Sequence, residues 1–249
     1  MKIVVSKTKE ELGSKAAELI AQKLRAAIAD QGRARMILST GASQFTTLSA
    51  LVQTEGIDWS KVTMFHLDEY VALPVSHPAS FRKYLTERFI DLVHPGACYL
   101  VNGEGDLTEN IRSLTEKLRE APVDVGVIGI GENGHIAFND PPADFETREA
   151  YKVVTLDEAC KRQQMGEGWF PTIDDVPRQA ISMTPYQIMQ CRSIVSAVPD
   201  ERKAKAIASM LKASETTNLI PCTLLKTHPD CTLFLDSGSA SLCDLELLE

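Results

Sequence analysis

The sequence predicts an α/β protein in which a doubly wound, mostly parallel sheet carries helices on both faces. Short apolar runs bounded by glycine or polar turns recur along the chain, which is typical of strands buried on both faces. Segments with apolar residues at helical spacing lie between these runs. Because no repeat, low-complexity tract or charged linker interrupts this alternation, we expect residues 1–249 to form a single domain, with a flap around residues 141–178.

The first half of the chain alternates strand and helix. Thr8-x-x-Glu11 resembles a capping box and precedes a helical apolar stripe, and Asp106-x-x-Glu109 can cap another helix. A helix should begin near Phe45, and Pro78 is placed where the first turn of a helix tolerates proline. Strands are expected at residues 2–5, 35–39, 61–67 and 97–101.

The second half begins with the most apolar run in the chain, residues 125–130, which we expect to form the central strand. Residues 157–177 are polar, with prolines and glycines, and should form a partly helical flap. A helix should open after Pro199-Asp200. Further strands are expected at residues 151–156, 179–183, 192–198 and 231–235.

The composition excludes several classes of function. A hydrophobic content of 44% and a charged content of 24% are those of an ordinary globular protein. The net charge of −8 argues against nucleic acid or anionic membrane as a partner. The charged residues near the N-terminus and the lack of a long apolar span predict a cytoplasmic protein. The sequence does not decide whether the protein forms a homo-oligomer. The six cysteines form no Cys-x-x-Cys pair, so we expect free, packed thiols and no metal site.

The turn after the central strand contains Gly129-x-Gly131-x-x-Gly134, which matches the fingerprint of dinucleotide-binding loops. That fingerprint requires a helix to open at the third glycine. Pro141-Pro142 follows closely and would block such a helix. We therefore expect no nicotinamide cofactor.

The same turn carries a histidine at the carboxyl end of the central strand, where ligands bind in open α/β sheets. Asn133 lies two residues before His135, and Asp140 lies five residues after it. An imidazole held by such partners can transfer protons near neutral pH. The alternative is a histidine that only satisfies carbonyl groups of its own loop.

A second candidate for acid–base chemistry follows the strand at residues 61–67. Asp68 and Glu69 are adjacent, so in an extended chain their side chains point in opposite directions. One should face the cleft as a general base, and the other should serve the structure. The alternative is an exposed loop acid.

Two features could bind an anion. Thr40-Gly41-Ala42-Ser43 lies between a strand and a helix, an arrangement that points backbone N–H groups at a phosphate. Lys203 lies near the start of a later helix and could reach the same group. An ordinary capped βα turn and a solvated lysine are the alternatives, and Arg202 and Lys205 are equally close by spacing.

Four motifs occur together in a family-specific order. They are Thr40-Gly41-Ala42-Ser43, Phe65-His66-Leu67-Asp68-Glu69-Tyr70 with His77-Pro78-x-Ser80-Phe81, Gly129 to Asn139 around His135, and Lys203-Ala204-x-Ala206. Between about Arg35 and Leu235 the chain resembles the glucosamine-6-phosphate deaminases, a family that shares its fold with the 6-phosphogluconolactonases.

The resemblance implies a Rossmann-like domain that isomerises an amino-sugar phosphate and releases ammonia without a cofactor. Asp68 matches the general base that moves a proton between C2 and C1. His135 matches the residue that assists opening of the sugar ring, with Asn133 and Asp140 orienting it. Thr40, Gly41, Ala42 and Ser43 together with Lys203 match the phosphate-binding elements, so the expected partner is a small phosphosugar.

The chain also departs from the family pattern. Asn133 stands where some members have aspartate, and Asp140 stands where glutamate is usual. The flap arginine that contacts phosphate in many members has no obvious counterpart. Glu167 or Gly168 stands near its place, and Arg162 is a candidate substitute. The arginine of the allosteric amino-sugar site in some family members aligns near Ala150 of this chain. We therefore do not expect allosteric activation.

These departures leave alternatives open. The galactosamine 6-phosphate epimer could be the substrate. A 6-phosphogluconolactonase would typically have Asp-Glu-Arg in place of Asp68-Glu69-Tyr70. A non-catalytic sugar-phosphate sensor should carry a DNA-binding module, and we expect none because neither terminus has spare length or basic charge.

Overall fold

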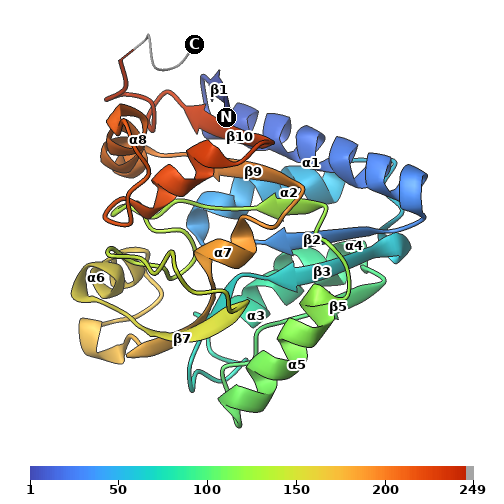
Figure 1. Cartoon of the computed structure of the whole chain (residues 1–249), viewed down its shortest axis with the longest axis horizontal. Helices are drawn as coiled ribbons and strands as arrows, with labels where there is room; N and C mark the ends of the chain where they lie inside the picture. The colour runs from blue at the N-terminus through green and yellow to red at the C-terminus, as the bar shows by residue number, and fades with distance from the viewer. Residues whose placement is uncertain (245–249) are drawn as a thin grey trace.

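The computed structural model of the protein describes residues 1–244. A seven-stranded sheet runs through the molecule in the order β1-β10-β9-β6-β2-β3-β5, and every pairing in it is parallel (Figure 1). Its strands are β1 (Lys2–Ser6), β2 (Ala34–Leu38), β3 (Val62–His66), β5 (Ala97–Tyr99), β6 (Val125–Val127), β9 (Ser193–Val198) and β10 (Cys231–Asp236). The predicted α/β class is confirmed, with β6 in the middle of the sheet.

Helices cover both faces of this sheet. The longer ones are α1 (Lys9–Gln31), α2 (Phe45–Gln53), α5 (Leu107–Arg119), α6 (Glu158–Gly166) and α8 (Ala204–Lys212). The short ones are α3 (Phe81–Leu85), α4 (Asp91–Val93) and α7 (Pro185–Ile188).

Alternation along β2 divides the core in two. Met36 and Leu38 pack with α1 and α2 on one face of the sheet. Ile37 points to the other face and packs with α5, α7 and α8. All three side chains are fully buried, as expected for a strand covered on both sides.

The predicted capping signals are found at two helices. The Thr8 hydroxyl accepts a hydrogen bond from the Glu11 N–H at 3.2 Å, and the Asp106 carboxylate accepts one from the Glu109 N–H at 3.1 Å. The placement of Pro78 in a first helical turn is wrong. Ser80 caps α3 instead, because its hydroxyl can accept from the Lys83 N–H, and Pro78 lies in the loop before it.

A second, smaller sheet was not anticipated. It is antiparallel, in the order β4-β8-β7, and consists of β4 (Asp68–Tyr70), β7 (Tyr151–Thr155) and β8 (Gln179–Met183). The strands expected at 61–67 and 125–130 are correspondingly shorter. β3 ends at His66, and the chain then crosses into β4. β6 ends at Val127, before the turn that contains Gly129, Gly131 and Gly134.

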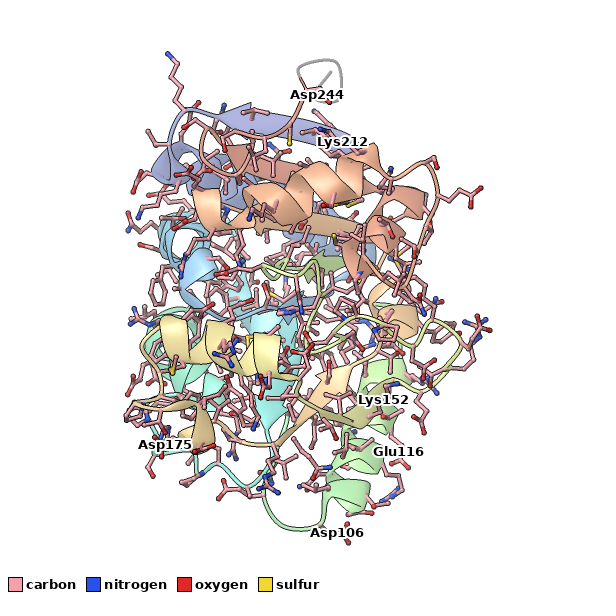
Figure 2. All side chains as sticks on the ribbon, turned by 90° about the vertical axis from the view of Figure 1, so that its left-hand side faces the viewer. Asp106, Glu116, Lys152, Asp175, Lys212 and Asp244 are labelled. Carbon is pink, nitrogen blue, oxygen red and sulfur yellow. The ribbon has the colours of Figure 1, made fainter. Side chains whose placement is uncertain are left out.

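The flap over residues 157–177 consists of α6 and a 3-10 turn, Ile173–Asp175. It packs on its own apolar cluster, which includes Tyr70, Phe138 and Phe170. Figure 2 looks onto the side of the molecule where α6 lies. No helix within residues 1–244 is both long and apolar enough to cross a membrane.

Candidate active site

A pocket lies where the carboxyl ends of β2, β3 and β6 meet the flap. Its lining combines the glycine turn after β2, the start of β4, the histidine turn after β6, the flap helix and the start of α8. The polar and charged side chains in that lining are Ser39, Thr40, Ser43, Asp68, His135, Gln163, Gln164, Glu167 and Lys203. The topology therefore brings together candidate residues that are far apart in the sequence.

Asp68 lies in this pocket and is buried. Among residues 1–244 no hydrogen bond satisfies its carboxyl group. Burial, and then the nearby charge of Glu69, raise the pKa of Asp68 to about 8. A carboxyl group with that pKa can take and return a proton near neutral pH.

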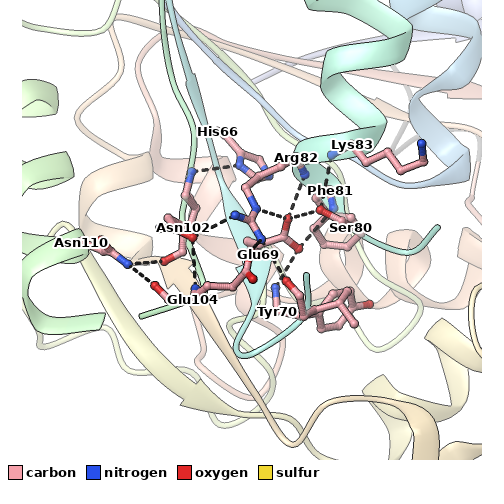
Figure 3. Close-up of polar contacts among 12 residues, drawn as sticks. His66, Glu69, Tyr70, Ser80, Phe81, Arg82, Lys83, Asn102, Glu104 and Asn110 are labelled. Carbon is pink, nitrogen blue, oxygen red and sulfur yellow. Dashed lines mark hydrogen bonds and ion pairs between the residues drawn. The ribbon is translucent and has the colours of Figure 1, made fainter. Parts of the chain in front are cut away.

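Glu69 points to the opposite side of β4 and is fully buried there. Figure 3 shows its carboxylate at the start of α3, where it accepts from the Ser80 hydroxyl at 2.8 Å and the Arg82 N–H at 2.9 Å. The Arg82 guanidinium contacts Glu69 at 3.2 Å and Glu104 at 2.7 Å. Glu69 therefore anchors α3 to β4, while Asp68 remains free to face the pocket.

His135 is held from behind by Asp140. Its Nδ1 lies 3.0 Å from Oδ1 of Asp140, in a contact that is short but bent away from hydrogen-bond geometry. The Asn133 amide donates to the same Oδ1 at 3.0 Å, and its oxygen accepts the His135 backbone N–H at 3.0 Å. Asn133 thus holds Asp140 and the loop rather than the imidazole ring itself.

The charge of Asp140 is stabilised by these contacts. Burial raises the pKa of Asp140, but the His135, Asn133 and Cys160 contacts outweigh burial and hold it below its ordinary value. Asp140 and Asn133 do not line the pocket. Both lie behind the imidazole, where Asp140 contacts the ring and Asn133 holds Asp140 in place.

The histidine turn after β6 packs closely against the imidazole ring of His135. A Cβ on Gly131 would lie 2.2 Å from Cε1 of His135, so no other residue fits there without moving the ring. Gly134 has a φ of +85°, and the chain continues in turns and bends to Tyr151. The helix required by the dinucleotide fingerprint does not form, as the prolines predicted.

β2 leads into the turn that we expect to bind an anion. Gly41 has a φ of +96°, which glycine adopts without strain, and a 3-10 turn, Ala42–Gln44, continues into α2. Thr40, Gly41 and Ser43 line the pocket, whereas Ala42 does not.

Lys203 also lines the pocket and is only 5% exposed. In the part of the chain that the structure describes, its ammonium group has no ion-pair partner within 4.0 Å. Burial lowers the pKa of Lys203. A buried, unpaired ammonium group facing a pocket is suited to bind an anion.

Sequence reasoning missed the contribution of the flap helix. Gln163 accepts the Glu132 N–H at 3.1 Å, and Gln164 accepts the Tyr70 hydroxyl at 2.7 Å. The available signal was spacing, because four polar or sulfur-bearing residues share one face of α6. They are Cys160, Gln163, Gln164 and Glu167.

Arg162 does not replace the missing flap arginine. Its side chain is 65% exposed, pairs with Glu158 at 3.2 Å, and does not line the pocket. The residue that reaches the pocket from this part of the flap is Glu167.

One group of side chains within residues 1–244 has donor atoms close enough to hold a metal ion. Donor atoms of His135, Asp140 and Cys160 lie within 4.8 Å of one another. Burial raises the pKa of the Cys160 thiol above its ordinary value, and Asp140 raises it further. The thiol is therefore held in the neutral form, which is a poor metal ligand.

Comparison with known proteins agrees with this geometry. The family model described as glucosamine-6-phosphate isomerases/6-phosphogluconolactonase matches residues 7–234. The chain belongs to this family. It is 34% identical over 243 residues to a glucosamine-6-phosphate deaminase of Lactobacillus delbrueckii subsp. bulgaricus, covering 97% of this chain and 99% of that protein. A Thermoanaerobacter pseudethanolicus protein of the same name is 33% identical, with coverages of 97% and 95%.

Solved structures show the same relationship. A monomeric glucosamine-6-phosphate deaminase matches with a TM-score of 0.87 and 31% identity. The match covers 97% of the present chain and 100% of the deaminase chain. A putative 6-phosphogluconolactonase from Neisseria gonorrhoeae matches with a TM-score of 0.74 and 19% identity, covering 95% and 99%. The second likeness shows the shared fold alone.

Proposed function

We propose that the protein converts glucosamine 6-phosphate and water to fructose 6-phosphate and ammonia. One observation carries the proposal: a carboxyl group with a raised pKa, an oriented imidazole and a buried free lysine line a single pocket. The relatives that match nearly the whole chain bear the name of this activity.

Each group then has a distinct task. His135 gives a proton to the ring oxygen as the C1 hydroxyl loses one, which opens the sugar ring. Asp68 removes the C2 proton while the aldehyde oxygen at C1 gains a proton, which gives an enolamine. Asp68 then returns its proton to C1 as the amino group loses one, so the double bond moves from C1=O to C2=N and an imine is left at C2. Water hydrolyses this imine, forming the ketone and releasing ammonia. Lys203 and the turn at residues 40–43 hold the phosphate away from the reacting carbons and so supply positioning energy.

Ammonia release tests this proposal. The enzyme is incubated separately with glucosamine 6-phosphate, galactosamine 6-phosphate and 6-phosphogluconolactone. We expect ammonia and equimolar fructose 6-phosphate from glucosamine 6-phosphate. Comparison with the rate of ammonia release from galactosamine 6-phosphate shows which epimer the enzyme prefers. Hydrolysis of the lactone without deamination would assign the lactonase activity instead. Thermal stabilisation by phosphosugars without turnover would identify a sensor.

We also infer that the protein works in the cytoplasm. A doubly charged sugar phosphate does not cross a bilayer unaided, so an enzyme that consumes it must share its compartment. Fractionation of cells that express a tagged protein tests this inference, with activity expected in the cytoplasmic fraction.

A further inference from the structure

A carboxylate lies in the part of the pocket that we assign to phosphate. Glu167 at the end of α6 places Oε2 3.8 Å from where a Cβ on Gly41 would be. The Gln163 amide donates to the other oxygen at 3.1 Å, and Gln163 in turn accepts the Glu132 N–H at 3.1 Å. Two successive hydrogen bonds thus hold the carboxylate beside the turn at residues 40–43.

The cations near this carboxylate are outnumbered by acids. Of the charged groups that raise the pKa of Lys203 against burial, Glu167 has the largest effect, ahead of Glu132. Arg202, the other cation nearby, is engaged by Glu132 at 3.7 Å and by Asp200 at 3.6 Å. One ammonium group and one carboxylate therefore line the same pocket as the turn, whereas a phosphate dianion calls for net positive charge.

Helix stability does not account for an acid at this position. Glu167 is the C-cap of α6, where the helix dipole is negative and disfavours a carboxylate. Its side-chain hydrogen-bond partner, Gln163, lines the pocket, and its other carboxylate oxygen lies beside Gly41, which also lines it. The residue is therefore better explained by what the pocket binds.

We propose that Glu167 competes with the substrate's phosphate for Lys203 and the turn at residues 40–43. The inference rests on the proposed function. Binding of a phosphosugar requires the carboxylate to move away from the turn or to tolerate a second negative charge beside it. Glu167 thereby weakens phosphosugar binding and couples the position of α6 to occupancy of the phosphate subsite.

Glu167→Gln tests this proposal, because the amide keeps the size of the side chain and removes its charge. Glu158→Gln is the matched control, since Glu158 starts the same helix with a side chain that is 80% exposed. KM and kcat for glucosamine 6-phosphate are measured, together with Ki for inorganic phosphate as a competitive inhibitor. We expect E167Q to lower KM and the phosphate Ki at least tenfold, with a smaller change in kcat, and E158Q to match the wild type.

A KM and a phosphate Ki that are unchanged in E167Q would overturn the proposal. An increase in both would also overturn it, because the carboxylate would then be a direct contact of the substrate. If the wild type releases no ammonia from either amino-sugar phosphate, the proposed function fails. Calorimetric titration of wild type and E167Q with inorganic phosphate then decides the role of Glu167 independently.

Discussion

Asp68 and Glu69 are neighbours in the chain, yet their carboxyl groups lie on opposite sides of β4 and meet different surroundings. Glu69 is fully buried and satisfied by Ser80, Arg82 and backbone N–H groups. Asp68 has a pKa raised to about 8, first by burial and then by Glu69. The strand thus separates a structural acid from a reactive one by a single residue.

The raised pKa of Asp68 predicts a pH dependence. The base must be ionised to act, so kcat/KM should rise with pH and level off above about pH 8. Below that value it should fall about tenfold per pH unit. The profile is measured from pH 6.5 upward, because the second ionisation of a phosphate monoester lies near 6. A flat profile between pH 6.5 and 8.5 would be inconsistent with Asp68 as the base.

Replacing Glu69 should damage stability. Glu69→Gln leaves Arg82 beside an uncharged partner at a site where the two side chains are 0% and 11% exposed. Breaking a buried ion pair of this kind costs about 3 kcal/mol. Urea unfolding measures the loss, and Glu104→Gln is the control because its side chain is 43% exposed at the same arginine. Equal, small losses in both variants would show that Glu69 does not anchor α3.

Gly131 should be indispensable for the position of His135. Gly131→Ala puts a methyl group where the imidazole ring now lies, so the ring must rotate or shift. We expect kcat to fall by about 100-fold, since a displacement near 1 Å can cost that much. Gly166→Ala is the control, because a Cβ there meets nothing within 4 Å and its φ is not in the left-handed range. Normal turnover in the Gly131 variant would contradict the observed packing.

Lys203 should act on binding more than on turnover. Lys203→Met removes the ammonium group but keeps an apolar stem in the buried position, so KM for the phosphosugar should rise at least 30-fold, about 2 kcal/mol for a charge-assisted contact. Lys205→Met is the control, because Lys205 is exposed in the first turn of α8, two residues after Lys203. The sequence could not choose between these lysines. A larger effect at Lys205 would show that the wrong one was chosen.

Much of the fold follows from local patterns. Strands buried on both faces leave apolar runs, so β2, β9 and β10 lie close to their predicted places. The opposite orientations of Asp68 and Glu69 follow from the two-residue repeat of a strand. The antiparallel sheet was missed because pairing of β4 with β8 joins residues more than a hundred positions apart, and no local signal encodes it.

Contacts within one sequence motif could be predicted from the sequence. Contacts between segments that are distant in the sequence could not. The partnership of His135 with Asp140 is local, so the turn itself suggested it. The fit of the imidazole against Gly131 and the reach of Glu167 over Gly41 depend on how separate segments pack. Arg162, the candidate substitute from the flap, faces solvent because of its position on α6.

Ammonia release by wild type and by Asp68→Asn, measured side by side with glucosamine 6-phosphate, tests the central claim most directly. The asparagine has nearly the same shape but cannot take the C2 proton, so we expect kcat to fall at least about 1,000-fold with KM within a few-fold of wild type. Near-normal kcat in this variant would mean that another group removes the proton and that the assignment of Asp68 is wrong.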